Sequence, residues 1–202
     1  MRVTGITSPS ELLCLAKSIG RPVPSPTGQL IKRLTPVLQR GARAGTLSAT
    51  YETGSFPLHT DTAFWPIPCR YVVMRAFGDC RRPTTILSFS DLLQDATPEI
   101  HALIDRSVWR VRTQSRGFYC SFRFRGKESS GWRYDQTCMH PVNKAAFVLH
   151  DRLLGLPGCS HVETLEWTGD LAIVLDNWKV LHGRGPEPPE ERLRILERIY
   201  VE

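Results

Sequence analysis

Three side chains from two widely separated segments could bind one metal ion together. His59 and Asp61 lie two residues apart in PLHTDTAF, and His182 lies in DNWKVLHGRG. Two imidazoles and one carboxylate are typical ligands of non-haem Fe(II), where they occupy one face of the ion and leave the opposite positions open. A bidentate co-substrate and O2 can then bind there. The residue types therefore predict an iron centre suited to oxygen chemistry.

The His59-Thr60-Asp61 triplet needs a local structure that presents both ligands on one side. We expect a strand near residues 57–62, because alternate side chains of a strand share a face and His59 and Asp61 would project together. Taken alone, the triplet also describes a polar strand end with a hydrogen-bonded histidine and a capping aspartate. The segment around His182 favours the metal site.

That distal segment has the pattern of a buried strand, a turn and a second strand. Residues 171–175 form an apolar, branched run between Gly169 and the polar residues that follow. We expect His182 at the start of the second strand or in the residues leading to it. In the closing segment 192–201, period-2 alternation places Arg192, Arg194 and Arg198 on one face. Such a row of guanidinium groups suits a carboxylate, and a dicarboxylate co-substrate is the expected anion.

These segments resemble the taurine dioxygenase-like (clavaminate synthase-like) family of Fe(II)/2-oxoglutarate-dependent oxygenases. The resemblance extends from about Ser48 to Glu202. It rests on HTD at 59–61, GDLAIVLDNWKVLHGR at 169–184 and RILER at 194–198. It implies Fe(II) as cofactor, with 2-oxoglutarate and O2 as co-substrates. The implied reaction converts 2-oxoglutarate to succinate and CO2 while the substrate is hydroxylated or otherwise oxidised.

The resemblance also implies roles for individual residues beyond the three ligands. Arg194, twelve residues after His182, would bind the far carboxylate of 2-oxoglutarate, and Arg198 would face the substrate. A threonine of the family that contacts 2-oxoglutarate corresponds to Thr85. The run RPTTIL lacks the Gly-Asp pair that usually precedes this threonine, so Thr84 remains the alternative. Because Asp61 is retained, halogenation is not expected.

Two further residues are candidates for the substrate pocket. Trp65 follows the HTD segment, and Arg133 lies in the run Trp132–Asp135; the family often uses side chains from these regions. Core packing is the alternative for Trp65. For Arg133 the alternative to a substrate carboxylate is a salt bridge to Asp135 or another acid, because arginine rarely lies buried without a partner. Asn177 is expected to shape the turn before His182 and not to touch substrate.

The expected fold class is α+β and mainly β: a jelly roll of the double-stranded β-helix kind with a few flanking helices, in one domain over residues 1–202. Local capping signals predict three helices: from Ser8, where Pro9 and Glu11 complete a capping box, to about Gly20; from Thr97 to about Arg106; and from Asn143 to Leu154, with Gly155 as its stop. Strands are expected near residues 46–52, 57–62, 69–76, 84–88, 108–113, 118–125, 132–136, 162–166, 171–175 and 192–201. Many short strands with few helices are typical of a jelly roll.

Composition bounds the partners and the location. The formal charge of +6 and sequence pI of 9.2 favour anionic partners. Residues 112–127 interleave Arg with Phe and Tyr and could stack on single-stranded nucleic acid, but they also describe a strand with one buried and one solvated face, so nucleic acid is not the expected partner. Six scattered cysteines without a CxxC motif, no signal core and no membrane-spanning run predict a cytoplasmic protein.

The predicted function is a 2-oxoglutarate-dependent dioxygenase that acts on a small amino-acid-like or carboxylate substrate. Two alternatives remain open. The chain could be a non-catalytic jelly-roll protein that binds a carboxylate, in which case metal binding is weak and 2-oxoglutarate is not turned over. It could instead oxidise a carrier-bound or nucleic-acid substrate, in which case activity falls steeply with salt. The oligomeric state is left open by the sequence.

Overall fold

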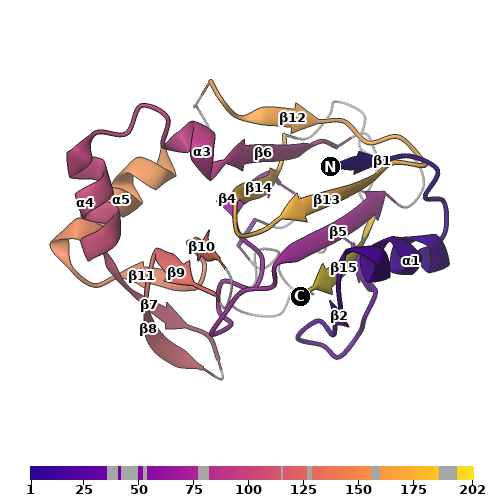
Figure 1. Cartoon of the computed structure of the whole chain (residues 1–202), viewed down its shortest axis with the longest axis horizontal. Coiled ribbons are helices and arrows are strands. Elements are labelled where there is room, and N and C mark those ends of the chain that lie inside the picture. The colour runs from indigo at the N-terminus through magenta and orange to yellow at the C-terminus, as the bar shows by residue number, and fades with distance from the viewer. Residues whose placement is uncertain are drawn as a thin grey trace.

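The computed structural model of the chain is shown in Figure 1. It describes residues 1–35, 41, 50–51, 54–76, 82–114, 116–126, 129–155, 160–186 and 195–202. Arg194, residues 46–49 and 52 of the strand expected near 46–52, and the start of the closing segment lie outside these ranges. Residues 50–51 are helical, so the strand prediction is wrong there. No described helix is long and apolar enough to cross a membrane.

The elements are, in chain order, β1 (Arg2–Val3), α1 (Pro9–Ile19), β2 (Pro22–Val23), β3 (Lys32–Leu34), β4 (Phe56–His59), β5 (Tyr71–Ala76), β6 (Thr84–Ser88), α3 (Phe89–Leu92), α4 (Pro98–Arg106), β7 (Val108–Arg112), β8 (Gly117–Ser121), β9 (Arg123–Arg125), β10 (Ser130–Trp132), β11 (Met139–Pro141), α5 (Lys144–Leu154), β12 (Glu163–Leu165), β13 (Ala172–Asp176), β14 (Val180–Arg184) and β15 (Leu196–Val201). The three predicted helices are confirmed: α1 has the Ser8 capping box and ends at Gly20, α4 follows Thr97, and α5 is capped by Asn143 and Gly155.

Two antiparallel sheets form the jelly roll and enclose one apolar core. The larger sheet has the order β1-β13-β5-β15-β2, with β3 also paired to β15, and the smaller has the order β12-β6-β14-β4. Side chains of β5, β13 and β15 meet those of β6 and β12 in this core, for example Val72, Met74 and Tyr200 against Leu165 and Ile86. The antiparallel pairs and few helices confirm the predicted fold class.

Helices and a third sheet cover the outer faces of these two sheets. Leu12 and Ala16 of α1 pack on Val73, Ile199 and Val201 behind the larger sheet. At the opposite end of the molecule in Figure 1, α4, α5 and the sheet β11-β7-β8 pack against the outer face of the smaller sheet. The smaller sheet is therefore held between two apolar clusters, which fixes the strands that carry both candidate histidines.

Three strand predictions are corrected by long-range contacts. The strand expected at 118–125 breaks at Phe122, whose side chain enters the core while β8 pairs with β7 and β9 pairs with β10. The strand expected at 132–136 ends at Trp132, because Tyr134 exchanges hydrogen bonds with Thr60 and Asp135 opens a turn. The strand that contains His59 ends at that residue, so Asp61 lies in a turn.

Candidate metal centre

Strand pairing brings the two candidate histidines together. β14 lies between β4 and β6, and its register places His182 directly opposite His59. Directly opposed residues of an antiparallel pair point to the same face, and the two imidazole ring centroids are 4.6 Å apart. Two segments separated by more than a hundred residues are thus joined by one register, which brings the HTD motif and the distal histidine together.

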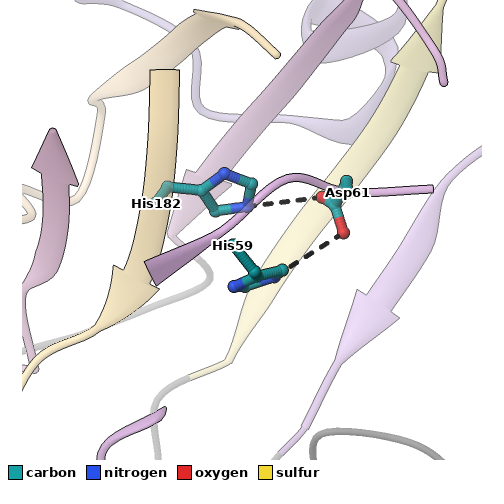
Figure 2. Close-up of side chains that lie close together, drawn as sticks. All are labelled: His59, Asp61 and His182. Atoms are coloured by element: carbon teal, nitrogen blue, oxygen red, sulfur yellow. Dashed lines mark ion pairs between the residues drawn. The ribbon is translucent and has the colours of Figure 1, made fainter. Parts of the chain in front are cut away.

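Asp61 completes the cluster from a turn and not from a strand (Figure 2). Its carboxylate lies 3.4 Å from Nε2 of His182 and 4.0 Å from Nε2 of His59, and one possible ligand atom from each of the three residues lies within 4.8 Å of the others. Among the described residues no other group of three His, Cys, Asp or Glu side chains is arranged in this way. The chelate geometry predicted from strand alternation therefore arises differently, since the chain turns after His59 and Thr62 takes a positive φ of 54°.

Asn177 fixes the turn that carries Asp61. Its side-chain oxygen accepts a hydrogen bond from the backbone N–H of Asp61 at 2.8 Å, and its amide nitrogen donates to the carbonyls of Asp61 and Cys69 at 2.9 and 3.0 Å. Asn177 is fully buried. The sequence assigned this residue to the turn before His182, and its larger role was missed because the contact crosses 116 positions of the chain.

The nitrogen atoms of His59 are oriented for metal binding. Nδ1 lies 3.0 Å from the carbonyl oxygen of Pro57, a partner that only an N–H can satisfy, so the Nε2 lone pair faces Asp61 and His182. Such a partner is the usual way to hold a ligating histidine in one tautomer. Burial lowers the pKa of His59, and the neighbouring His182 lowers it further, so the neutral form that binds metal is favoured.

Asp61 remains ionised although its side chain is almost fully buried. Burial alone would raise its pKa, but the guanidinium of Arg198 and the two imidazoles hold the pKa below its usual range. Nη1 of Arg198 donates to both carboxylate oxygens at 2.8 and 2.9 Å. The hydroxyl of Tyr200 lies 3.4 Å from one of the same oxygens. The donor set of two imidazole nitrogens and one carboxylate fits Fe(II).

The predicted substrate residues occupy different positions around this cluster. Arg198 points at Asp61 from the inner face of β15, with its guanidinium 4.6 Å from the Tyr200 ring. Trp65 packs edge-on against Tyr200 at 5.8 Å and contributes to the core between the sheets. Packing, the alternative weighed for Trp65, is therefore present, and its contact with substrate stays a prediction.

Arg133 does not form the salt bridge that was the alternative to a substrate contact. Its guanidinium donates to the backbone carbonyls of Ala63, Trp65 and Pro66 at 3.2, 3.0 and 2.7 Å. Among the described residues it has no ion pair, because the Asp135 carboxylate accepts hydrogen bonds from Thr137 instead. Arg133 holds the loop that follows Asp61, and its proposed contact with a substrate carboxylate stays untested.

The register of β6 separates the two candidate threonines. Ile86 lies opposite His182, so alternation places Thr84 on the same face as His182, where it accepts a hydrogen bond from Nε1 of Trp167 at 3.1 Å. Thr85 lies opposite Gly183 on the other face, and a Cβ at Gly183 would meet its hydroxyl at 2.8 Å. The geometry favours Thr84 over Thr85, whereas Arg194 lies outside the described residues.

A cavity of about 770 Å³ opens beside the smaller sheet. Its walls include Ile86 and Ser88 of β6, Ile173 of β13 and Val180 of β14. None of the three candidate ligands lines it. The cavity is thus distinct in its lining from the metal cluster, although Ile86 lies opposite His182 in the β-sheet.

The fold is shared with several solved structures, among them two oxygenases. The chain is similar to asparagine oxygenase in complex with Fe(II), 2S,3S-3-hydroxyasparagine and succinate (TM-score 0.74, 19% identity, 94% of this chain and 63% of that one). It is also similar to the non-haem iron oxygenase OrfP in complex with Fe and alpha-ketoglutaric acid (TM-score 0.72, 18% identity, 95% of this chain and 63% of that one). PvcB from Pseudomonas aeruginosa is a third structural neighbour (TM-score 0.70, 20% identity, 98% of this chain and 72% of that one).

These comparisons establish the fold. The chain spans 63% of the length of the first two neighbours. No protein-family model and no curated protein matches the sequence. The double-stranded β-helix of the non-haem iron oxygenases is therefore shared at low sequence identity, and the candidate ligands have been located by geometry within this chain.

Proposed function

We propose that the protein is a non-haem Fe(II)- and 2-oxoglutarate-dependent dioxygenase that hydroxylates, or otherwise oxidises, a small amino-acid-like or carboxylate substrate. The observation that carries this proposal is the convergence of His59, Asp61 and His182 inside a jelly roll, with one possible ligand atom from each within 4.8 Å of the others. A cluster built from two distant motifs on this fold is a specific arrangement, and fold alone would not suffice.

The three side chains would hold Fe(II) through Nε2 of each histidine and the carboxylate of Asp61. When bound, the metal supplies the site at which O2 is activated and 2-oxoglutarate is oxidatively decarboxylated to succinate and CO2. Arg194 remains the proposed partner of the far carboxylate of 2-oxoglutarate. Thr84, on the face of His182, is the threonine that the register favours for the same carboxylate.

Residues of the chain around the cluster prepare it for this chemistry. The Pro57 carbonyl keeps a proton on Nδ1 of His59, which leaves Nε2 free to ligate. Asn177 binds both the backbone N–H and the backbone carbonyl of Asp61. Tyr200 and Trp65 form an aromatic wall beside the carboxylate, which limits the access of water.

An anionic or amino-acid-like substrate is supported by two observations. Arg198 places a guanidinium next to the candidate iron ligand, with Nε buried and without a hydrogen-bond partner in the described structure. Two structural neighbours were solved with hydroxyasparagine and with hydroxylated arginine. A substrate carboxylate near Arg198 would satisfy an unpaired donor, which is favourable in a buried site. A cytoplasmic location stays a prediction, and the described cysteines, which are free thiols, agree with it.

The proposal is tested by product analysis. Protein loaded with Fe(II) should convert 2-oxoglutarate to succinate in air, faster when a suitable amino acid is present, and that amino acid should gain one oxygen atom by mass spectrometry. Asp61→Ala should be inactive with the same panel. If the folded, iron-loaded protein binds 2-oxoglutarate but forms no succinate with any substrate, the non-catalytic carboxylate-binding alternative is correct.

A further inference from the structure

The positive charge of the chain is concentrated in one short stretch. Residues 107–127 contain five Arg, one Lys and no Asp or Glu, so the stretch carries a formal charge of +6. The whole chain also carries +6, because the other residues hold twenty Lys and Arg and twenty Asp and Glu. Such an asymmetry predicts a local interaction with an anionic partner, which overall net charge does not.

The structure places two of these six charges, Arg110 and Arg112, on one face of the sheet β11-β7-β8. Alternation directs Trp109, Val111 and Met139 into the core beneath the sheet. Arg110 and Arg112 point to solvent, together with Tyr119, which is 67% exposed. The exposed face therefore carries arginine and tyrosine above an apolar, well-packed base. No acidic residue lies on any of the three strands.

The register of the three strands places exposed side chains directly opposite one another. Arg110 lies opposite Tyr119 on one side and opposite His140 on the other. Neither Arg110 nor Arg112 has an ion pair or hydrogen-bond partner for its side chain among the described residues. Arg123 on the adjacent β9 differs, because it pairs with Asp105 at 3.0 Å. The charge on this face is thus available to a second molecule.

We propose that the exposed face of β11-β7-β8, defined by Arg110, Arg112, Tyr119 and His140, is a docking surface for an acidic protein. Arg and Tyr are enriched among the residues that dominate protein–protein binding energy, and charge complementarity steers such encounters. The exposed Tyr119 of β8, opposite Arg110 of β7, provides both features. Every charge that an acidic partner would meet there is favourable.

A single-stranded nucleic acid fits the face less well. Binding of this kind uses several exposed rings on which successive bases stack. Tyr119 is the only such ring on the described face, because Phe118 is half-buried, Phe122 is buried and Phe124 packs edge-on against Trp178. The aromatic residues that the sequence interleaves with arginine mostly point inward.

The same strands support the loop beside the candidate metal centre. The rings of Phe118 and Phe124 lie 5.9 and 4.7 Å from the guanidinium of Arg133, which binds the backbone of the loop after Asp61. Because Phe118 belongs to β8, a partner on the exposed face would bind a strand that is linked to this loop through Arg133. The docking proposal stands independently of the oxygenase proposal, because it rests on charge and exposure alone.

The test measures binding of three defined probes to the full chain: a helical Glu-rich peptide, its Gln-substituted counterpart and an oligothymidylate of similar length. Arg110→Glu/Arg112→Glu reverses two charges on the face. Arg2→Glu/Lys17→Glu is the matched control, because it changes the net charge equally at exposed positions on other elements. Circular dichroism establishes that each variant is folded.

The proposal expects the Glu-rich peptide to bind in preference to the other two probes, with an affinity that falls with salt. Arg110→Glu/Arg112→Glu should weaken binding by roughly tenfold or more, and the control variant should weaken it much less. Three results would overturn the proposal: tighter, Tyr119-dependent binding of the oligothymidylate, equal losses in both variants, or no preference for the Glu-rich peptide over its Gln counterpart.

Discussion

Glu197 and Arg198 are neighbours on β15, yet their buried ion pairs on opposite faces of the strand differ in kind. Glu197 accepts hydrogen bonds from Nε of Arg75 at 2.9 Å and from Arg33 at 3.2 Å, and Arg75 also donates to the Thr7 carbonyl. Arg198 uses only Nη1 toward Asp61, and its buried Nε has no partner. The Glu197 pair, whose hydrogen-bonding groups have partners, stabilises the fold. The Asp61–Arg198 pair leaves a buried donor without a partner beside two imidazoles, so it is suited to bind a ligand.

Around Asp61, removal of a candidate metal ligand should have the largest effect of these substitutions on Fe(II) affinity. Loss of an outer-sphere partner of a metal ligand weakens metal binding by roughly 10–100-fold. His182→Ala removes one of three ligands, so it should weaken Fe(II) binding by more than about a hundredfold. Binding is measured by anaerobic titration. His150→Ala is the matched control, since His150 packs against Trp109 and Tyr134 instead. Equal losses in the two variants would contradict the site.

Breaking the Glu197 pair should affect stability and not the metal. Glu197→Ala leaves the buried Arg75 without its partner and should lower the free energy of unfolding by about 3–5 kcal/mol. Denaturant unfolding measures this value. In the folded variant, Fe(II) affinity should be unchanged within about threefold. A large loss of Fe(II) affinity without a loss of stability would show that Glu197, on one face of β15, affects the metal cluster on the other face.

Arg198→Ala should affect turnover more than stability. Asp61 keeps both imidazoles beside it, so we expect a smaller loss of stability than for Glu197→Ala. The kcat/KM for the substrate should fall by about a hundredfold, the loss expected for a charged contact of about 2.7 kcal/mol, with only a mild change in the 2-oxoglutarate requirement. Steady-state kinetics with each reactant varied separates the two. A selective increase in the 2-oxoglutarate KM would reassign Arg198 to the co-substrate.

Asn177 connects the two motifs without contributing a ligand, so its loss should have an intermediate effect on the metal. Asn177→Ala should lower Fe(II) affinity by about 10–100-fold, since an unsupported turn holds Asp61 less well. Asn143→Ala is the control, because it removes a half-buried amide that caps α5. It should lower the free energy of unfolding by about 1 kcal/mol and leave the Fe(II) affinity unchanged. If both variants lose only stability, Asn177 has no positioning role.

The smallest effect concerns pH. His59 has a lowered pKa in the folded, metal-free protein, whereas an unfolded histidine titrates near about 6.5. Below that pH the unfolded state takes up the proton more readily, so the free energy of unfolding should decline as the pH falls from about 7 to 5. His59→Gln should flatten this decline. An unchanged slope in the variant would assign the pH dependence to other groups.

Local signals were enough to predict α1, α4 and α5, although α3 (Phe89–Leu92) was missed, and they indicated the candidate ligands. The Ser8 capping box, the Thr97-Pro98 start and the Asn143 cap each act within one turn of helix, so the sequence alone located α1, α4 and α5. The three candidate ligands were proposed from residue types and from the resemblance of the surrounding motifs. Both kinds of signal are contained in short segments.

Features that depend on distant contacts could not be predicted in the same way. Asp61 lies in a turn because Asn177 binds its backbone from the other motif. Arg133 turns toward the carbonyls of residues 63–66, which no local pattern indicates. The face of Thr84 follows from the pairing of β6 with β14. A one-residue change of register would have reversed that assignment.

The most direct test of the central claim is anaerobic titration of the metal-free protein with Fe(II) and then with 2-oxoglutarate, followed by visible absorption. Bidentate binding of 2-oxoglutarate to iron should produce a weak charge-transfer band, and the band should be absent in His182→Ala. Its appearance would establish His59, Asp61 and His182 as an iron site that accepts the co-substrate. Failure of the folded wild-type protein to form the band would contradict the oxygenase proposal.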